Sequence, residues 1–201
     1  MTLRRLVLWR HGETDFNAEK RIQGQLDSKL TRNGLDQAHR AAHSLAELEP
    51  AVLMTSDLSR AGDTAAVLAA KTGMPLHVDK RLRETNCGTW QGLTHAEVET
   101  LCPGGIQTWR GDPQWAPPGG ETRVEVATRA AYVIAELDAA GVGSAVLCTH
   151  GGLIAGLTPQ LLGLPVTGWS VFAGISNCHW TTLVRGDTGW RLFAYNSAAP
   201  V

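Results

Sequence analysis

The chain has 201 residues, of which 43% are hydrophobic and 18% charged, and its formal net charge at pH 7 is −1. This length suits one well-buried domain and is short for two, and the composition is that of an ordinary globular protein. The near-balance of charge supplies no basic field for nucleic acid or for an anionic membrane surface, so we expect neither as a partner.

Cysteine usage and hydropathy indicate a soluble, cytoplasmic chain. Four cysteines are scattered without a CxxC pair, which predicts reduced packing residues and not disulfides or a metal site. The apolar run over residues 6–9 is too short for the core of a signal peptide. No apolar run reaches the length of about 18 residues that a membrane span requires.

The first expected element is a buried strand over residues 3–9, which stops abruptly at Arg10-His11-Gly12. The polar residues 12–30 are expected to be irregular. Thr31 is the predicted N-cap of a helix that Pro50 ends. Five apolar residues recur at helical spacing and predict its buried face: Leu35, Ala38, Ala42, Leu45 and Leu48.

A strand over residues 51–55 follows, then a turn into a helix that ends at Gly73, and a third strand over residues 76–78. From Leu82 the composition changes to Gly, Pro and Trp, which predicts a lid or insertion at about residues 85–120.

The last part of the chain alternates strands and helices again. The expected elements are a helix over residues 122–140, a strand over 145–149, a helix from 152 to 162, and strands over 176–185 and 190–196. This alternation indicates a single α/β domain over residues 1–201, with a mostly parallel sheet and an antiparallel edge.

Two of the predicted strands end in the same way, one at His11-Gly12 and the other at His150-Gly151-Gly152. In an open α/β sheet, functional groups gather where strands end, so these two histidines can meet across a crevice. A neutral imidazole is a nitrogen nucleophile near pH 7, and the Arg10 guanidinium suits bidentate contact with phosphate oxygens. For His150 taken alone, a capped strand end remains the simpler interpretation.

Two further charged residues have alternative interpretations. Arg60 lies in the first turn of its helix, where a cation opposes the helix dipole; a bound phosphate relieves that conflict, but a solvated side chain is the alternative. Glu84 precedes the lid and is a candidate acid near the substrate. A surface salt bridge with Arg81 or Arg83 explains Glu84 equally well.

Taken together, the ordered motifs resemble the histidine phosphatase (phosphoglycerate mutase-like) superfamily over nearly the whole chain. The segments that carry this resemblance are Arg10-His11-Gly12-Glu13-Thr14, Asn17, Gly24, Leu30 to Ala38, Ser56 to Ala65, Leu82 to Gly92, Gly120-Glu121 and Thr149 to Gly152. The resemblance implies a three-layer α/β/α fold and a phosphohistidine mechanism that needs neither metal nor another cofactor.

Carried onto this sequence, the resemblance implies that His11 takes the phosphoryl group and that Glu84 protonates the departing alcohol. The residues implied to hold the phosphoryl oxygens are Arg10, Arg60 and His150, joined by Asn17, Gln23, Gly24 and Gly151. Positioning and cationic donors supply most of the catalysis of phosphoryl transfer, so this set of residues suits the reaction.

A hydrolase is favoured over a mutase. A mutase must retain a second phosphate and therefore needs further cations, yet between Thr85 and Gly120 the only Lys or Arg is Arg110. The lid is similar to that of the actinobacterial glucosyl-3-phosphoglycerate phosphatases, which implies that substrate. Trp109 and Trp115 are then candidate sugar platforms, with plain lid packing as the alternative. A phosphatase of broad specificity is the other interpretation.

Other classes of protein find less support. His39 and His43 are spaced i,i+4 as metal ligands can be, but no third ligand is evident near them. A catalytically inactive binding module would be expected to lack one of the catalytic residues, and all are present. No GxSxG, GxGxxG or Walker sequence occurs. The related phosphatases are often dimers, so analogy allows a homodimer through the C-terminal strands.

Overall fold

A computed structural model describes residues 2–200 of the chain. Its centre is a six-stranded sheet in the order β3-β2-β4-β1-β5-β6. The strands are β1 Arg5–Arg10, β2 Val52–Thr55, β3 Leu76–Val78, β4 Ser144–Thr149, β5 Trp180–Gly186 and β6 Gly189–Ser197. The first four are parallel, whereas β5 is antiparallel to β1 and β6 to β5. The predicted mostly parallel sheet with an antiparallel edge is confirmed.

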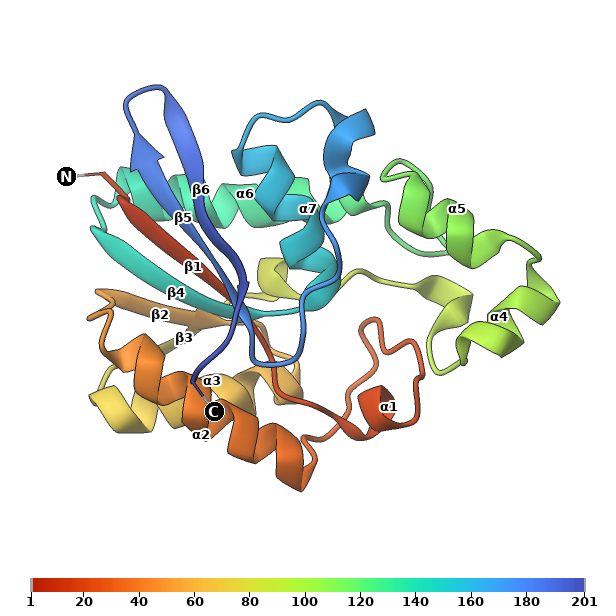
Figure 1. Ribbon diagram of the computed structural model, residues 1–201, viewed down its shortest axis with the longest axis horizontal. Helices are drawn as coiled ribbons and strands as arrows, with labels where there is room; N and C mark the ends of the chain where they lie inside the picture. Colours follow the sequence, from red (N-terminus) through yellow and green to blue (C-terminus); the bar gives the residue numbers. More distant parts are fainter. Residues whose placement is uncertain (1, 201) are drawn as a thin grey trace.

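Helices cover both faces of this sheet (Figure 1). The α-helices are α1 Asp15–Ala18, α2 Arg32–Ala46, α3 Ser59–Thr72, α4 His95–Leu101, α5 Gly105–Gly111, α6 Arg123–Ala139 and α7 Gly151–Leu161. One apolar cluster joins the sheet to α2 and α3, and a second joins it to α6 and α7. The three-layer α/β/α arrangement is therefore confirmed. Within residues 2–200, no helix combines the length and apolar character needed to cross a bilayer.

Strand β1 shows how the sequence builds both clusters. Alternate side chains of a strand point to opposite faces of the sheet. Leu6 and Leu8 accordingly pack with α6 and α7, whereas Val7 and Trp9 pack with α2 and α3. All four side chains are buried, so β1 is a central strand with no face in solvent.

The ends of α2 differ from the prediction. Thr31 caps the helix as expected, because its side chain accepts a hydrogen bond from the Gly34 amide. Leu35 is 40% exposed and does not belong to the buried face, and Leu48 lies beyond the helix end at Ala46. Spacing assigned both residues to the apolar face. That prediction is wrong for Leu35, whereas Leu48, although it follows the helix, packs against the same apolar cluster as Ala38.

The polar stretch after His11 contains a helix that was not predicted. Residues 15–18 form α1, and Thr14 and Asn17 make a reciprocal capping box around its first turn. The first strand also begins two residues later than expected, at Arg5, and the fifth begins at Trp180 and not at 176.

The insertion at about 85–120 carries α4 and α5, which lie beyond one end of the sheet (green in Figure 1). It has its own apolar cluster, formed by five buried side chains: Ile22, Cys87, Trp90, Val98 and Ile106. Ile22 comes from the stretch after α1, so this cluster attaches the insertion to the loops that follow β1.

The loop that leaves β1 is held by a close contact between backbones. A Cβ atom at Gly34, in the first turn of α2, would collide with the carbonyl oxygen of Glu13, and one at Gly12 would collide with the carbonyl oxygen of Gly34. Two glycines therefore let the N-terminus of α2 lie directly against the residues that follow His11.

We expect Gly34→Ala to destabilise the fold by about 1–3 kcal/mol, because backbone atoms must move to admit the methyl group. The matched control is Gly62→Ala within α3, where no atom lies within 4 Å of the added Cβ. Helix propensity alone should make that variant more stable by about 0.5–1 kcal/mol. Urea unfolding measures both free energies. Equal free energies of unfolding for the two variants would show that the backbone around Gly34 admits the methyl group without cost.

Candidate active site

A cavity of about 470 Å³ opens where β1 and β4 end. It is lined by seven of the nine residues predicted for the site: Arg10, His11, Asn17, Gln23, Gly24, Arg60 and Glu84. These residues come from β1, the 12–30 segment, α3 and the loop before the insertion. A concave site with several convergent charged groups is the usual form of an active site.

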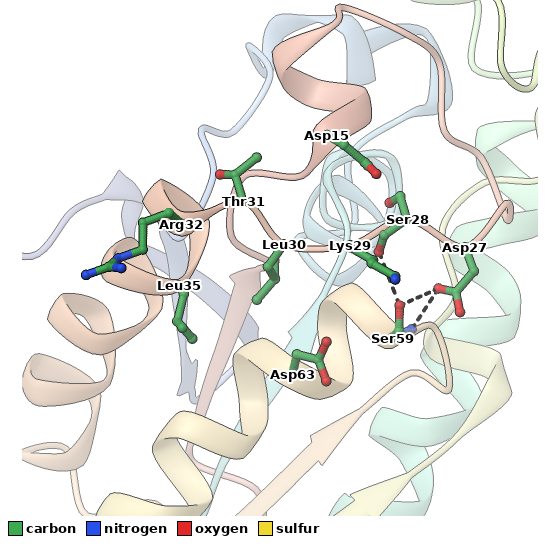
Figure 2. A pocket seen from close by; sticks show the side chains of 10 residues that line it. All are labelled: Asp15, Asp27, Ser28, Lys29, Leu30, Thr31, Arg32, Leu35, Ser59 and Asp63. Atoms are coloured by element: carbon green, nitrogen blue, oxygen red, sulfur yellow. Dashed lines mark hydrogen bonds between the residues drawn. The ribbon is translucent and has the colours of Figure 1, made fainter.

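A larger hollow, of about 1020 Å³, lies between the loop that precedes α2 and the start of α3 (Figure 2). Asp27 lines it and accepts hydrogen bonds from both the amide and the hydroxyl of Ser59. None of the predicted site residues lines this hollow. We therefore assign the candidate site to the smaller cavity.

His11 is buried and held in one orientation. Its Nδ1 lies 2.7 Å from the Gly12 carbonyl oxygen, which can only accept, so Nδ1 carries the proton and Nε2 has a free lone pair. Burial lowers the pKa of His11 well below 6.5, and the positive charges of Arg60 and Arg10 lower this pKa further. The ring is therefore neutral near pH 7, as a nitrogen nucleophile must be.

His150 lies beside His11 but does not line the cavity. The parallel strands β1 and β4 pair Arg10 with Thr149, so the next residues of both strands are neighbours, and the two imidazole rings are 5.2 Å apart. His150 Nε2 is 2.7 Å from the Ser56 hydroxyl oxygen, and its side chain is fully buried. Burial lowers the pKa of His150 well below 6.5.

Arg60 is fully buried, so the alternative of a solvated side chain is wrong. It donates to the carbonyl oxygens of Leu26 and Gly24 at 2.8 and 2.7 Å. Burial lowers its pKa to about 10, which leaves the guanidinium charged near neutral pH. Arg10 donates to the Ile175 carbonyl oxygen at 2.6 Å, and burial lowers its pKa as well.

Both guanidinium groups retain unused donors. Within residues 2–200, the buried Nε atoms of Arg10 and Arg60 have no hydrogen-bond partner, nor does Nδ1 of His150. Leaving buried polar groups unpaired costs free energy, and more for charged groups. An oxyanion in the cavity would pair these donors, because it brings negative charge and several acceptor oxygens together.

The polar residues of the 12–30 segment are fixed around the cavity. The Asn17 side-chain oxygen accepts hydrogen bonds from Thr14 and Asn177. Within the described residues its amino group makes no hydrogen bond, so that donor is left for a ligand. The Gln23 side-chain oxygen accepts from the Ser28 hydroxyl at 2.7 Å.

Glu84 is placed by the backbone at the N-terminus of α7. Its carboxylate oxygens accept hydrogen bonds from the amides of Gly152, Leu153 and Thr85, at 2.7–3.2 Å. A Cβ atom at Gly152 would collide with this carboxylate, so glycine there permits the close approach. The predicted salt-bridge alternative is wrong, because Arg81 and Arg83 pair with other acidic residues.

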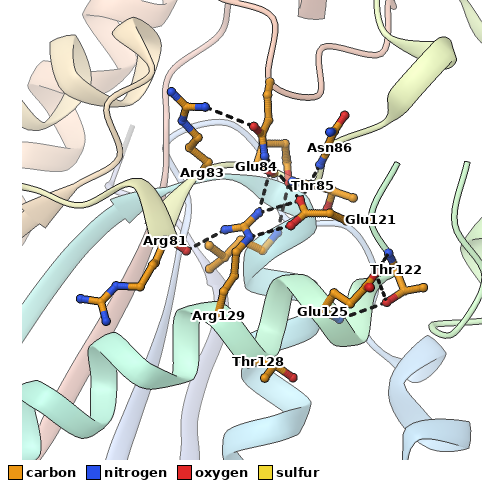
Figure 3. A network of polar contacts seen from close by, with 12 residues as sticks. Arg81, Arg83, Glu84, Thr85, Asn86, Glu121, Thr122, Glu125, Thr128 and Arg129 are labelled. Carbon is orange, nitrogen blue, oxygen red and sulfur yellow. Dashed lines mark hydrogen bonds and ion pairs between the residues drawn. The ribbon is translucent and has the colours of Figure 1, made fainter. Parts of the chain in front are cut away.

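A network around Arg129 of α6 holds the backbone of Glu84 (Figure 3). The Arg129 guanidinium donates to the carbonyl oxygens of Glu84 and Arg81, at 2.8 and 2.7 Å, and pairs with the Glu121 carboxylate at 2.9 Å. Glu121 in turn accepts from the Asn86 amide at 2.8 Å. Arg129 therefore ties the loop of Glu84 to both α6 and the end of the insertion.

The residues that line the cavity differ in part from those predicted for the site. Gly151, a predicted site residue, packs against the Arg10 side chain and does not line the cavity, whereas its neighbour Gly152 does. The sequence analysis did not place Lys20, Thr85 or Cys87 in the site, although all three line the cavity. No role was predicted for them, although Thr85 and Cys87 lie in the Leu82 to Gly92 segment, because their proximity to His11 depends on how that segment packs against residues 12–30.

No metal centre is found among residues 2–200, in the sense of three or more clustered His, Cys, Asp or Glu side chains. His43 lies 3.8 Å from the carboxylate of Glu47 on the exposed face of α2. The four cysteines are free thiols. Burial raises the pKa of the Cys87 thiol, so this cavity residue is not a thiolate nucleophile near neutral pH.

Burial of His11 and His150 predicts a loss of stability in mild acid. Their pKa values in the fold lie well below 6.5, whereas an unfolded histidine titrates near about 6.5. Below that pH the unfolded chain binds protons that the folded chain does not. The free energy of unfolding should therefore fall by up to about 1.4 kcal/mol per pH unit for each histidine.

Urea unfolding between about pH 7.5 and pH 5, in phosphate-free buffer, measures this slope. We expect a shallower slope for His150→Gln than for the unmodified chain. The exposed His77→Gln variant is the matched control for the substitution itself. A slope that is unchanged in His150→Gln would contradict burial of a neutral ring at this position.

Comparison with known proteins agrees with this geometry. A family model described as the histidine phosphatase superfamily (branch 1) matches residues 6–198. The glucosyl-3-phosphoglycerate phosphatase of Mycolicibacterium vanbaalenii is 47% identical over 220 residues, covering 100% of this chain and 98% of that protein. The protein of the same name from Mycobacterium tuberculosis is 45% identical, with coverage of 100% and 98%.

Among solved structures, a mycobacterial glucosyl-3-phosphoglycerate phosphatase in complex with VO3 is similar to this chain. It has a TM-score of 0.94 and 46% sequence identity, with coverage of 97% of this chain and 100% of that one. Both the family model and these relatives span nearly the whole chain. The chain therefore belongs to the histidine phosphatase superfamily (branch 1).

Proposed function

We propose that this chain hydrolyses the phosphate ester of glucosyl-3-phosphoglycerate through a phosphohistidine on His11. The observation that carries the chemistry is the neutral, oriented His11 ring beside two buried guanidinium groups with unused donors. The substrate is proposed from the relatives at 45–47% identity, which bear that phosphatase name. One of their structures is a complex with VO3, an oxyanion.

In the first half of the reaction, the lone pair on His11 Nε2 attacks phosphorus. A P–N bond forms while the P–O bond to the alcohol breaks, and Glu84 delivers a proton to the departing oxygen. Arg10 and Arg60 bind the phosphoryl oxygens, with Asn17 donating from the side. The charge on these oxygens spreads in the transition state, so preorganised donors supply most of the rate.

In the second half, water attacks phosphorus on the side that the alcohol has left. Glu84 accepts a proton from this water, the P–N bond breaks, and inorganic phosphate leaves with His11 neutral again. The structure has His11 Nδ1 hydrogen-bonded to the Gly12 carbonyl, and neither half of the proposed reaction uses that nitrogen. This hydrogen bond keeps the reacting nitrogen the same throughout the cycle.

The distribution of charge around the cavity supports hydrolysis over mutase chemistry. Beyond Arg10 and Arg60, the cations that line it are Lys20, Arg21 and Arg110. Arg21 is already engaged by Glu19 and Glu97, at 2.9 and 3.5 Å. Lys20 and Arg110 are both exposed to solvent, so the cavity has no second pair of enclosed cations, like Arg10 and Arg60, to retain a second phosphate. We further propose that the insertion at about 85–120 acts as the lid of this single domain.

Glu84→Gln should slow an alkyl phosphate far more than p-nitrophenyl phosphate. The nitrophenolate leaving group hardly needs a proton, whereas an alkoxide does, and acid catalysis contributes roughly 10²–10⁴-fold. Initial rates of phosphate release from both substrates measure the difference. Equal losses would remove Glu84 from the acid role. His11→Ala is the companion variant and should lose both activities while keeping the circular dichroism spectrum.

The experiment that tests the proposed substrate is phosphate release in EDTA from glucosyl-3-phosphoglycerate, 3-phosphoglycerate and a panel of sugar phosphates. We expect kcat/KM to be highest for the glucosylated ester, by roughly tenfold or more, since recognition of a whole sugar ring adds binding free energy of that order. Flat, slow turnover across the panel would refute the substrate and favour a phosphatase of broad specificity.

A further inference from the structure

A second cavity, of about 370 Å³, lies next to the one that contains His11. Its walls come from the insertion, the start of α6, the first turns of α7 and the segment 170–174. We infer that this second cavity is the binding site for the sugar ring of the leaving group. The inference rests on the proposed phosphatase function and adds to it where the glucosyl group lies.

The two cavities are adjacent and share four lining residues, which are Thr85, Trp109, Arg110 and Gly152. Their other linings differ. Arg10, His11 and Arg60 line only the first cavity, so the second contains none of the groups that hold the phosphoryl oxygens. A group bound in the second cavity would therefore not compete with the phosphate for those donors.

The boundary between the cavities lies on the leaving-group side of the reaction. The amides of Thr85 and Gly152 donate to the Glu84 carboxylate at 2.7 and 3.0 Å. The proposed role of Glu84 is to protonate the departing oxygen, which lies opposite the attacking His11 nitrogen in an in-line displacement. The alcohol must then extend past Glu84, toward the residues that the two cavities share.

Two aromatic side chains suit the second cavity to a sugar. The apolar C–H face of a pyranose packs on an aromatic ring much as other apolar groups do. Trp109 is braced by Trp90, with ring centroids 6.0 Å apart in an edge arrangement. Phe172 is braced by Tyr195 of β6 at 5.3 Å, and the Tyr195 hydroxyl donates to the Ala173 carbonyl. Both rings are thus held in place before a ligand binds.

The remaining lining is small or cationic. Ala155, Ala173 and Gly174 leave room for a ring, and the volume is within the usual range for small-molecule sites. Arg110 lines both cavities. In glucosyl-3-phosphoglycerate the phosphate is on C3 and the carboxylate is C1, so the sugar is on the C2 oxygen. The carboxylate is therefore next to the sugar, and a cation at the boundary matches this order.

An alternative occupant is a second phosphate, which would use Arg110 and Arg123. Arg123 already donates to the Trp109 carbonyl oxygen at 3.2 Å, and its side chain is half-buried. A dianion there would also lose water to the largely apolar rings of Trp109 and Phe172, which cannot replace its hydrogen bonds. A neutral sugar has a much smaller desolvation cost, so we assign the cavity to the sugar.

The test compares two substrates, glucosyl-3-phosphoglycerate and 3-phosphoglycerate, which differ only in the sugar. Phe172→Ala removes one wall of the second cavity, and Ala155→Met fills part of it from α7. For both variants we expect kcat/KM to fall on the order of tenfold for the glucosylated ester, mainly through KM, and to stay unchanged for 3-phosphoglycerate. Turnover of 3-phosphoglycerate also shows that each variant is folded.

Phe193→Ala is the matched control, because Phe193 is 75% exposed on β6 and lines neither cavity. It should leave both substrates unaffected. If the unmodified chain shows no preference for the glucosylated ester, the proposed substrate and the sugar site are both refuted. If that preference exists and persists in Phe172→Ala and Ala155→Met, the substrate stands and the sugar site alone is refuted.

Discussion

The structure of the site depends on the burial of two guanidinium groups, those of Arg10 and Arg60. Removing such a charge from water costs several kcal/mol, and the protein offsets only part of this cost with backbone carbonyls. The unused donors mark the place where we propose that an oxyanion binds. The same two charges, together with burial, keep His11 neutral. In the proposed reaction the same two charges bind the phosphoryl group and keep the His11 ring neutral, as a nucleophile must be.

Arginine-to-carbonyl contacts also order the irregular segments around the cavity. Arg60 fixes the loop at Gly24 and Leu26. Arg129 fixes the backbone at Glu84. These segments have no strand or helix of their own to hold them. A guanidinium with several fixed donors can satisfy several carbonyls at once, so a single side chain positions a whole loop.

The two halves of the site differ in chemistry and in origin. The phosphate half is charged and is built at the ends of β1 and β4, the most enclosed strands of the sheet. The leaving-group half is aromatic or small and comes from the insertion, α7 and the segment before β5. In this proposal the type of reaction depends on residues at the ends of the central strands, and the choice of substrate depends on segments outside the sheet.

Local patterns in the sequence predicted the strand ends at His11 and His150, the cap at Thr31 and the α/β alternation, because periodicity and capping are local properties. Seven of the nine predicted site residues line the cavity. The tertiary structure alone decided that Leu35 is exposed, that Gly152 and not Gly151 faces Glu84, and that a second cavity adjoins the first. Each of these depends on contacts between segments far apart in the chain, and such contacts leave no signal in local spacing.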